Sequence, residues 1–163
     1  YDTTTGRRIK LEDRIGFLDR KLRIVNENTD NLKDWMDAAV TAYQTSKAYE
    51  WQGDNLLLAR ESLLYTFIDN YEFKFGERPD REHVKEIAFI ISWNVWQMDG
   101  LKGVIPNSCH DVETRNLYGE VERTPCPGCK TKNIHKHNGI PVLLKVFSSG
   151  NTYPYHLLYN KNE

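Results

Sequence analysis

The feature that most constrains this chain is a group of cysteines and histidines in its last third. The group contains all three cysteines of the protein and three of its five histidines: Cys109, His110, Cys126, Cys129, His135 and His137. Cys126 and Cys129 flank Pro-Gly, and this turn directs two thiolates at one zinc ion about 2.3 Å away. With Cys109 as a third sulfur and one histidine, the tetrahedron is complete. A site with four protein ligands has no open position, so we expect structural zinc rather than catalytic zinc.

The identity of the histidine ligand stays open between two residues. His135 and His137 alternate, so in a strand both would lie on the same face, and we slightly favour His135. His110 directly follows Cys109, and adjacent residues rarely bind one ion, so it is a reserve ligand. Nothing sets the spacing of His156, which we do not expect to bind the metal. The alternative to zinc is three free thiols, or one disulfide and a free thiol.

Size and composition limit the class of protein. A chain of 163 residues can bury one real core, and a net charge of -1 excludes a globally basic nucleic-acid binder. No apolar run approaches the roughly 18–20 residues that cross a bilayer, and the polar first residues do not resemble a signal peptide. An odd number of cysteines beside histidines favours reduced thiols, so we expect a cytoplasmic protein.

Hydrophobic periodicity predicts helices that alternate with short strands. Apolar residues recur at helical spacing in four stretches, near 11–26, 32–46, 56–75 and 80–91. Short β-like runs stand at 48–52 and 93–97, and a hairpin is expected from 141–147 and 153–158. This order predicts an α/β fold with parallel pairing of the first two strands. We expect one domain over 1–104 and a zinc-binding β module over 105–163, which begins with a polar, turn-rich segment.

Two acidic residues end the predicted parallel strands. Ligands of doubly wound sheets lie beyond the carboxyl ends of the strands, where Glu50 and Asp99 stand. A carboxylate at such a position can accept hydrogen bonds from ribose hydroxyls or from an adenine amine. On spacing alone this signal is weak, and the favoured interpretation is that Glu50 is a solvated carboxylate and Asp99 a turn residue before Gly100. Trp51, nearby, is more often a core or pocket-wall residue than a stacking platform.

A resemblance to a known family extends over most of the chain. The motifs that carry it are Tyr49-Glu50-Trp51-Gln52-Gly53-Asp54-Asn55, Phe75-Gly76-Glu77-Arg78-Pro79 and Asn94-Val95-Trp96-Gln97-Met98-Asp99-Gly100-Leu101. In this order they resemble adenine-specific (N6) DNA methyltransferases of restriction-modification systems. The lead-in around Arg14-Ile15-Gly16-Phe17-Leu18 and the segment 126–139 also look like one branch of that family.

The resemblance implies a Rossmann-like sheet that binds S-adenosylmethionine. Glu50 would hold the ribose hydroxyls and Asp99 the adenine amine, with Met98 beside the ring and Trp51 in the same pocket. The family methylates N6 of adenine in DNA after the base is flipped out of the duplex. The implied partners are DNA and either the remaining methyltransferase segment or a restriction endonuclease.

Two family motifs are not in this sequence. The glycine-rich motif that grips the cofactor would stand just before Tyr1, and the catalytic Asn-Pro-Pro-Tyr is also missing. We therefore expect no catalytic residues here and no methylation of DNA by this chain alone. The alternative is a non-catalytic zinc-stabilised module that binds DNA or a protein. The zinc region is locally basic, through Arg123, Lys130, Lys132, Lys136 and Lys145, and these side chains are either solvated or in contact with phosphate.

Overall fold

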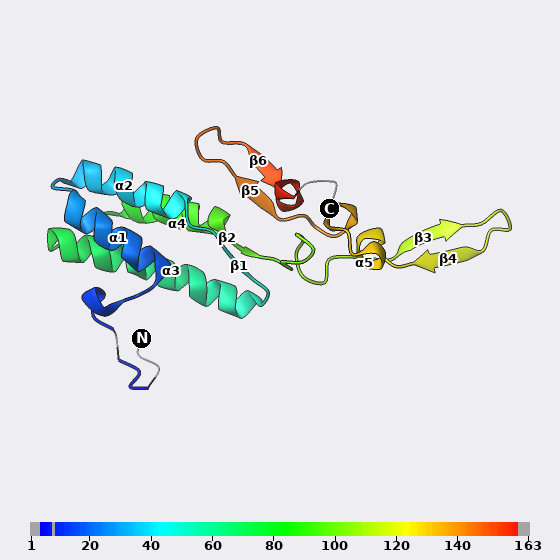
Figure 1. Ribbon diagram of the computed structural model, residues 1–163, viewed down its shortest axis with the longest axis horizontal. Coiled ribbons are helices and arrows are strands. Elements are labelled where there is room, and N and C mark those ends of the chain that lie inside the picture. Colours follow the sequence, from blue (N-terminus) through cyan, green and yellow to red (C-terminus); the bar gives the residue numbers. More distant parts are fainter. Residues whose placement is uncertain (1–3, 8, 160–163) are drawn as a thin grey trace. The chain divides into compact units, whose positions relative to one another are not determined.

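A computed structural model describes residues 4–7 and 9–159 of the chain. The fold is a mixture of helices and small two-stranded sheets (Figure 1). The helices are α1 (Phe17–Asn28), α2 (Leu32–Gln44), α3 (Gly53–Phe75), α4 (Arg81–Asn94) and α5 (Pro127–Thr131), with short 3-10 turns η1 (Leu11–Asp13), η2 (Ile134–Lys136) and η3 (Tyr155–Leu158). The strands are β1 (Ala48–Glu50), β2 (Val95–Gln97), β3 (Val112–Arg115), β4 (Val121–Thr124), β5 (Leu143–Lys145) and β6 (Thr152–Pro154).

The chain divides into two compact units. The helical unit comprises the chain up to Lys47 together with Leu57–Asn94, and the mixed unit comprises Ala48–Leu56 together with the chain from Val95 onward. The division differs from the expected boundary at residue 104, because β1 and β2 belong with the mixed unit. No helix among the described residues has the length and apolar character needed to cross a membrane.

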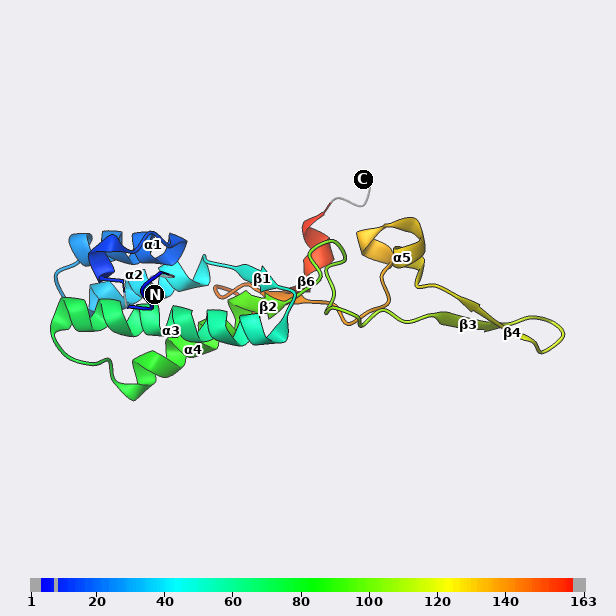
Figure 2. The same ribbon diagram turned by 90° about the horizontal axis from the view of Figure 1, so that it is seen from below.

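An aromatic cluster forms the core of the helical unit. The Trp35 side chain is fully buried, and its ring centroid lies 5.7 Å from that of Phe67, 5.5 Å from Tyr71 and 5.6 Å from Phe75. Trp35 belongs to α2 and the other three rings to α3, so these contacts pack the two helices together. The tilted and edge-on ring arrangements are those that aromatic pairs favour. Both ribbon views show α1, α2, α3 and α4 lying side by side in this unit (Figures 1 and 2).

A chain of hydrogen bonds satisfies the polar groups inside this core. The Trp35 indole donates to Asn26 Oδ1 at 2.7 Å, and Asn26 Nδ2 donates to Asn70 Oδ1 at 2.8 Å. Asn70 Nδ2 in turn donates to the Thr66 carbonyl oxygen at 2.8 Å. Because buried polar groups without partners are costly, this network fixes how α1, α2 and α3 fit together.

The first helix begins later than its periodicity predicts. A single turn, η1, is followed by extended backbone at Arg14, and α1 begins only after Gly16. The Arg14 guanidinium lies 2.7 Å from Asp69 Oδ2 and 4.0 Å from Asp19 Oδ1. These ion pairs anchor Arg14 to α3 and to the first turn of α1. Ile15, in this extended segment, is 85% exposed.

The predicted parallel pairing of the first two strands is confirmed. Tyr49 pairs with Trp96 and Glu50 with Gln97, and Met98 N donates to the Glu50 carbonyl oxygen at 2.9 Å. In sequence the two strands are joined through α3 and α4. The described sheet has only these two strands, so the coarser expectation of mixed helices and strands holds, while a larger Rossmann-like sheet remains a prediction.

The strand predicted from Trp93 begins two residues later, because Asn94 ends α4 instead. The Asn94 side chain is buried, and its Nδ2 donates to the Tyr43 and Gln44 carbonyl oxygens at 2.8 and 2.9 Å. These two carbonyl groups belong to the last turn of α2, where carbonyl groups have no hydrogen-bond donor within the helix. Asn94 therefore ties α4 to the end of α2.

Two antiparallel hairpins follow in the mixed unit. The predicted hairpin is present as β5 and β6, although the segment Tyr155–Leu158, expected as strand, is the 3-10 turn η3. The other hairpin, β3–β4, lies in the segment predicted to be polar and turn-rich. Its turn is built by Asn116, whose Oδ1 accepts from Tyr118 N and Glu120 N, and by Gly119 at φ +81°. Most of its residues are polar and exposed, so hydrophobic alternation did not reveal it.

Candidate metal centre

The Cys-Pro-Gly-Cys segment forms the short helix α5. Cys126 precedes its first residue, and Pro127 occupies the first helical position, where a missing N–H has no cost. A side chain at Gly128 would place its Cβ 2.5 Å from His137 N and 2.7 Å from His137 Cα. Only glycine allows this approach, which brings the backbone of His137 against the Cys-Pro-Gly-Cys segment, the zinc knuckle of this chain. Lys132, in a left-handed conformation at φ 55°, ends the helix.

Four side chains meet at this knuckle. The sulfurs of Cys109, Cys126 and Cys129 and a ring nitrogen of His137 all lie within 4.8 Å of one another. His137 Nδ1 is 3.5 Å from the Cys109 sulfur, 3.8 Å from that of Cys126 and 3.7 Å from that of Cys129. Tetrahedral zinc, with Zn–S bonds of about 2.3 Å and a Zn–N bond of about 2.0 Å, separates sulfur from nitrogen by about 3.6 Å. The four side chains could therefore hold a metal ion, and their spacing suits zinc.

Asn138 joins the separate segments that carry the ligands. Its backbone N–H donates to the Cys126 sulfur at 3.4 Å. Its side chain accepts from His110 N at 3.2 Å and donates to the His110 carbonyl oxygen at 2.8 Å, which fixes the segment that carries Cys109. Such residues orient ligands without touching the metal. The role of Asn138 was not predicted from the sequence, where its position directly after His137 is the available signal.

A second glycine permits close contact on the other side of the centre. A Cβ at Gly139 would lie 2.5 Å from Ser108 Oγ and 3.0 Å from Cys109 N. Ser108 Oγ accepts from Ile140 N at 3.0 Å, so the two segments run side by side. The glycine therefore lets the strand-like segment after His137 pack directly against Cys109.

Hydrogen bonds prepare the Cys126 thiol for metal binding. Burial opposes its ionisation, but the donors around the sulfur outweigh burial and lower the pKa of Cys126 to about 6. These donors are the backbone N–H groups of Asn138, Cys129 and Gly128 and the ring of His137. Since the thiolate is the form that binds metal, this arrangement favours ligation at neutral pH.

The charge at the centre extends to a lysine and an aspartate. Burial and the neighbouring thiol groups of Cys126 and Cys129 raise the pKa of Cys109 to about 11. Lys102 Nζ lies 3.4 Å from Asp99 Oδ2. Although burial opposes the charge of Lys102, its hydrogen bond to Asp99 and the nearby side chains of Cys129 and Cys109 raise its pKa. A bound divalent ion would allow Cys109 to ionise by opposite charge.

The other histidines do not join the group of four. The structure brings His137, and not the slightly favoured His135, to the three sulfurs. His135 lies in η2 rather than in a strand, so the two residues do not share a face as alternation implied. The His135 ring packs edge-on against His156, with centroids 5.6 Å apart. His110 contributes its backbone groups to Asn138 and is not in the group.

Glu50 and Trp51, the expected cofactor residues on the first strand, are accessible. Glu50 is half-buried at the carboxyl end of β1, and its Oε1 accepts from Gln52 N at 3.0 Å. The Trp51 side chain is 47% exposed, and its carbonyl oxygen accepts from Gln97 Nε2 at 3.0 Å. A carboxylate has further lone pairs, so Glu50 can still accept from a ligand hydroxyl.

Asp99 and Met98, the expected cofactor residues after the second strand, are buried. Asp99 Oδ1 accepts from Leu101 N at 3.0 Å, and Oδ2 pairs with Lys102. Its carbonyl oxygen accepts from Gly103 N at 2.8 Å, which closes a tight turn. Met98 is 3% exposed. In this conformation the Asp99 carboxylate stabilises the turn, so an adenine amine would have to displace these partners.

Comparison with known proteins gives no relative. The chain matches no protein-family model, no curated protein and no solved structure. The assignment of the metal centre therefore rests on the geometry of its four side chains.

Proposed function

We propose that the chain is part of an S-adenosylmethionine-dependent adenine-N6 DNA methyltransferase of restriction-modification type, inactive as this chain alone. One observation carries the proposal: two parallel strands, joined in sequence through helices, end at the same edge, the first in Glu50 and the second two residues before Asp99. This is the edge at which α/β sheets bind nucleotides. The resemblance of the surrounding motifs supplies the cofactor.

Within this proposal the carboxylates of Glu50 and Asp99 differ in how available they are to a ligand. Glu50 is placed to accept hydrogen bonds from ribose hydroxyls, and Trp51 beside it offers an exposed ring. Asp99 and Met98 fit less well, because both are buried and the Asp99 carboxylate is engaged by Leu101 and Lys102. Glu50 is accordingly the residue on which the proposal is tested.

Calorimetric titration with S-adenosylmethionine tests the proposal. The chain, supplied with the glycine-rich segment of the family, is expected to bind, and Glu50→Ala is expected to weaken binding by about 10–100-fold, the loss of hydrogen bonds to a charged group. Glu61→Ala, on an exposed position of α3, removes the same charge and should bind like the wild type. Failure to bind even with the added segment would contradict the cofactor role. Methyl transfer to DNA by the chain alone would contradict its inactivity.

The metal centre favours a second function, a zinc-stabilised binding module. Three sulfurs and one nitrogen at tetrahedral spacing leave no ligand position for a substrate, so the zinc holds structure. The metal joins Cys109 to a loop that spans Cys126–His137, and this loop carries several lysines. Binding of DNA or a protein without binding of the cofactor would favour this function over the first.

A further inference from the structure

A stretch of forty residues near the end of the chain, 123–162, contains no acidic residue. Because 23 of the 163 residues are acidic, about six would be expected in forty. The same stretch carries six basic residues: Arg123, Lys130, Lys132, Lys136, Lys145 and Lys161. The near-neutral net charge of the whole protein therefore conceals a strongly positive segment.

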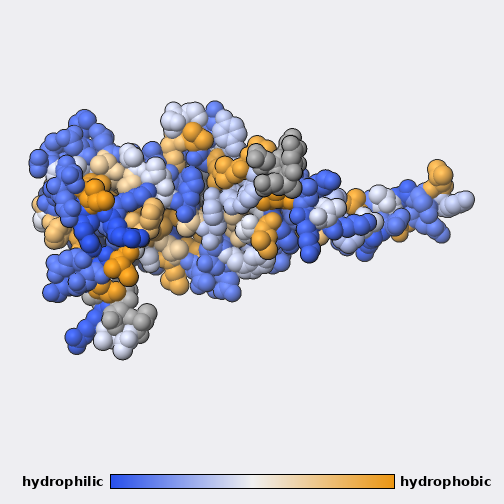
Figure 3. Space-filling view, viewed as in Figure 1, coloured by the Kyte–Doolittle hydropathy of each residue, from blue (hydrophilic) through white to orange (hydrophobic). Residues whose placement is uncertain are grey.

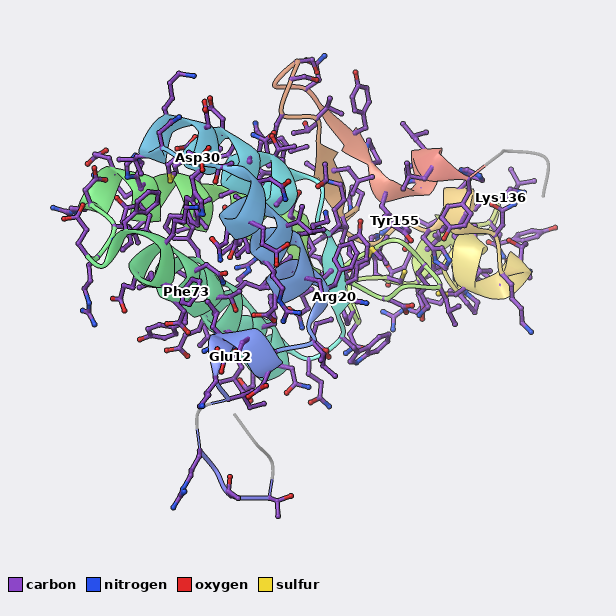
Figure 4. The ribbon with its side chains drawn as sticks, turned by 60° about the vertical axis from the view of Figure 1, so that its left-hand side comes forward. Glu12, Arg20, Asp30, Phe73, Lys136 and Tyr155 are labelled. Carbon is purple, nitrogen blue, oxygen red and sulfur yellow. The ribbon has the colours of Figure 1, made fainter. Side chains whose placement is uncertain are left out.

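Three of these lysines lie in the loop between two candidate metal ligands. Lys130, Lys132 and Lys136 stand between the ligands Cys126 and His137, and all three are exposed. None of them forms an ion pair with any residue of 4–7 or 9–159. Lys136, labelled in Figure 4, is in η2, which packs against α5, the helix that carries Lys130.

The backbone under these lysines is fixed. Lys130 N donates to the Cys126 carbonyl oxygen at 2.9 Å, and Lys136 N donates to the Asn133 carbonyl oxygen at 3.1 Å. Asn133 N itself donates to the Gly128 carbonyl oxygen at 3.2 Å. A metal bound at both ends of the loop would hold three positive charges in place without side-chain partners.

The metal centre does not neutralise this loop. A divalent ion with three thiolates and a neutral imidazole carries a net charge of about -1. Lys102, which lies near Cys109 and Cys129, offsets this charge, so the centre does not cancel the three positive charges of the loop. By contrast, two exposed lysines of the helical unit form ion pairs: Lys33 lies 3.0 Å from Asp37, and Lys85 lies 2.8 Å from Glu82.

We propose that Lys130, Lys132 and Lys136 form a nucleic-acid contact face that binds backbone phosphates without reading the sequence. A duplex carries one negative charge per about 1.7 Å of its axis, so closely spaced lysines engage several phosphates at once. A membrane surface suits the face less well. Amphipathic binding needs an apolar helix face, and α5 has five residues, one of which supplies a metal ligand. This inference does not depend on the proposed methyltransferase function; it rests on the second function, the zinc-stabilised binding module, and names nucleic acid as its ligand.

Fluorescence anisotropy of a labelled 20-base-pair duplex with the zinc-loaded full chain, without S-adenosylmethionine, tests the face. The wild type is expected to bind with an affinity that falls as salt rises. The slope of log K against log salt is negative, and the triple variant K130Q/K132Q/K136Q should make it shallower by about 2.7, which is about 0.9 for each lost phosphate contact. The control K10Q/K33Q/K85Q removes three exposed charges from the helical unit and should leave the slope unchanged.

Several results would overturn the inference. They are no binding at 20 mM salt, an equal loss in the triple variant and its control, or binding to anionic phospholipid vesicles in place of the duplex. Zinc content and circular dichroism of each variant establish that it is folded. If the triple variant lost its zinc, the three single Lys→Gln variants would each be expected to make the slope shallower by about 0.9.

Discussion

At the scale of single residues, the metal centre separates two histidines that stand two positions apart. His137 places Nδ1 3.5–3.8 Å from three sulfurs, whereas His135 packs against His156. We expect His137→Asn to weaken zinc binding by more than about 100-fold, because a ligand is lost and one coordination position is left to water. Competition with a chromophoric zinc chelator measures this affinity.

His135→Asn is the matched control for that prediction. It removes the same side chain from the same loop and should keep zinc affinity within a few fold of the wild type. Equal weakening in both variants, or weakening only in His135→Asn, would mean that the ligand is misassigned.

Residue types and spacing could predict most of this site but not its fourth ligand. The three cysteines were predicted from their spacing, because few other roles need Cys-Pro-Gly-Cys beside histidines. The choice between His135 and His137 depended on treating 134–137 as a strand, and the segment is a 3-10 turn. Asn138 was missed because its role depends on the path of Cys109, twenty-nine positions earlier, which local pattern does not give.

At the scale of helices and strands, the packing of Trp35 of α2 against α3 stabilises the helical unit. Truncation of this fully buried side chain removes its contacts with three rings of α3 and its hydrogen bond to Asn26. We expect Trp35→Ala to lower the free energy of unfolding by about 3–5 kcal/mol. Urea denaturation followed by circular dichroism at 222 nm measures the change.

Trp51→Ala provides the control for Trp35. The Trp51 side chain is 47% exposed, so its loss should change the free energy of unfolding by no more than about 0.5 kcal/mol. A destabilisation equal to that of Trp35→Ala would show that the two tryptophans pack alike and would contradict the described core.

The sequence predicted the long helices because turn-forming residues separate long runs of helix-forming residues. An apolar stripe was not needed in every case, since Leu57, Leu58 and Phe73 of α3 are exposed. Asn31 caps α2, because its side chain accepts a hydrogen bond from Asp34 N. Boundaries were less predictable where tertiary contacts decide them. Arg14 is held extended by Asp69, and Asn94 is held helical by the end of α2. The β3–β4 hairpin was not predicted because its strands are exposed on both faces, and hydrophilic atoms dominate its surface (Figure 3).

At the scale of the whole molecule, each compact unit has its own means of stability. The helical unit has an aromatic core, whereas the mixed unit combines three short two-stranded sheets with few fully buried residues. Isolated two-stranded hairpins are marginal in water, so a metal that joins Cys109 to the loop Cys126–His137 would stabilise the mixed unit disproportionately. The lysine face and the turn at Asp99 both belong to this unit.

The metal content of the purified chain tests this account most directly. Native mass spectrometry of protein prepared without chelators should show one zinc ion per wild-type chain and none on Cys126→Ser. The same variant should retain the helical signal of the helical unit, since its core lies apart from the cysteines in sequence. Wild-type protein with less than about one zinc per chain, or with a Cys126–Cys129 disulfide in its place, would contradict the metal centre.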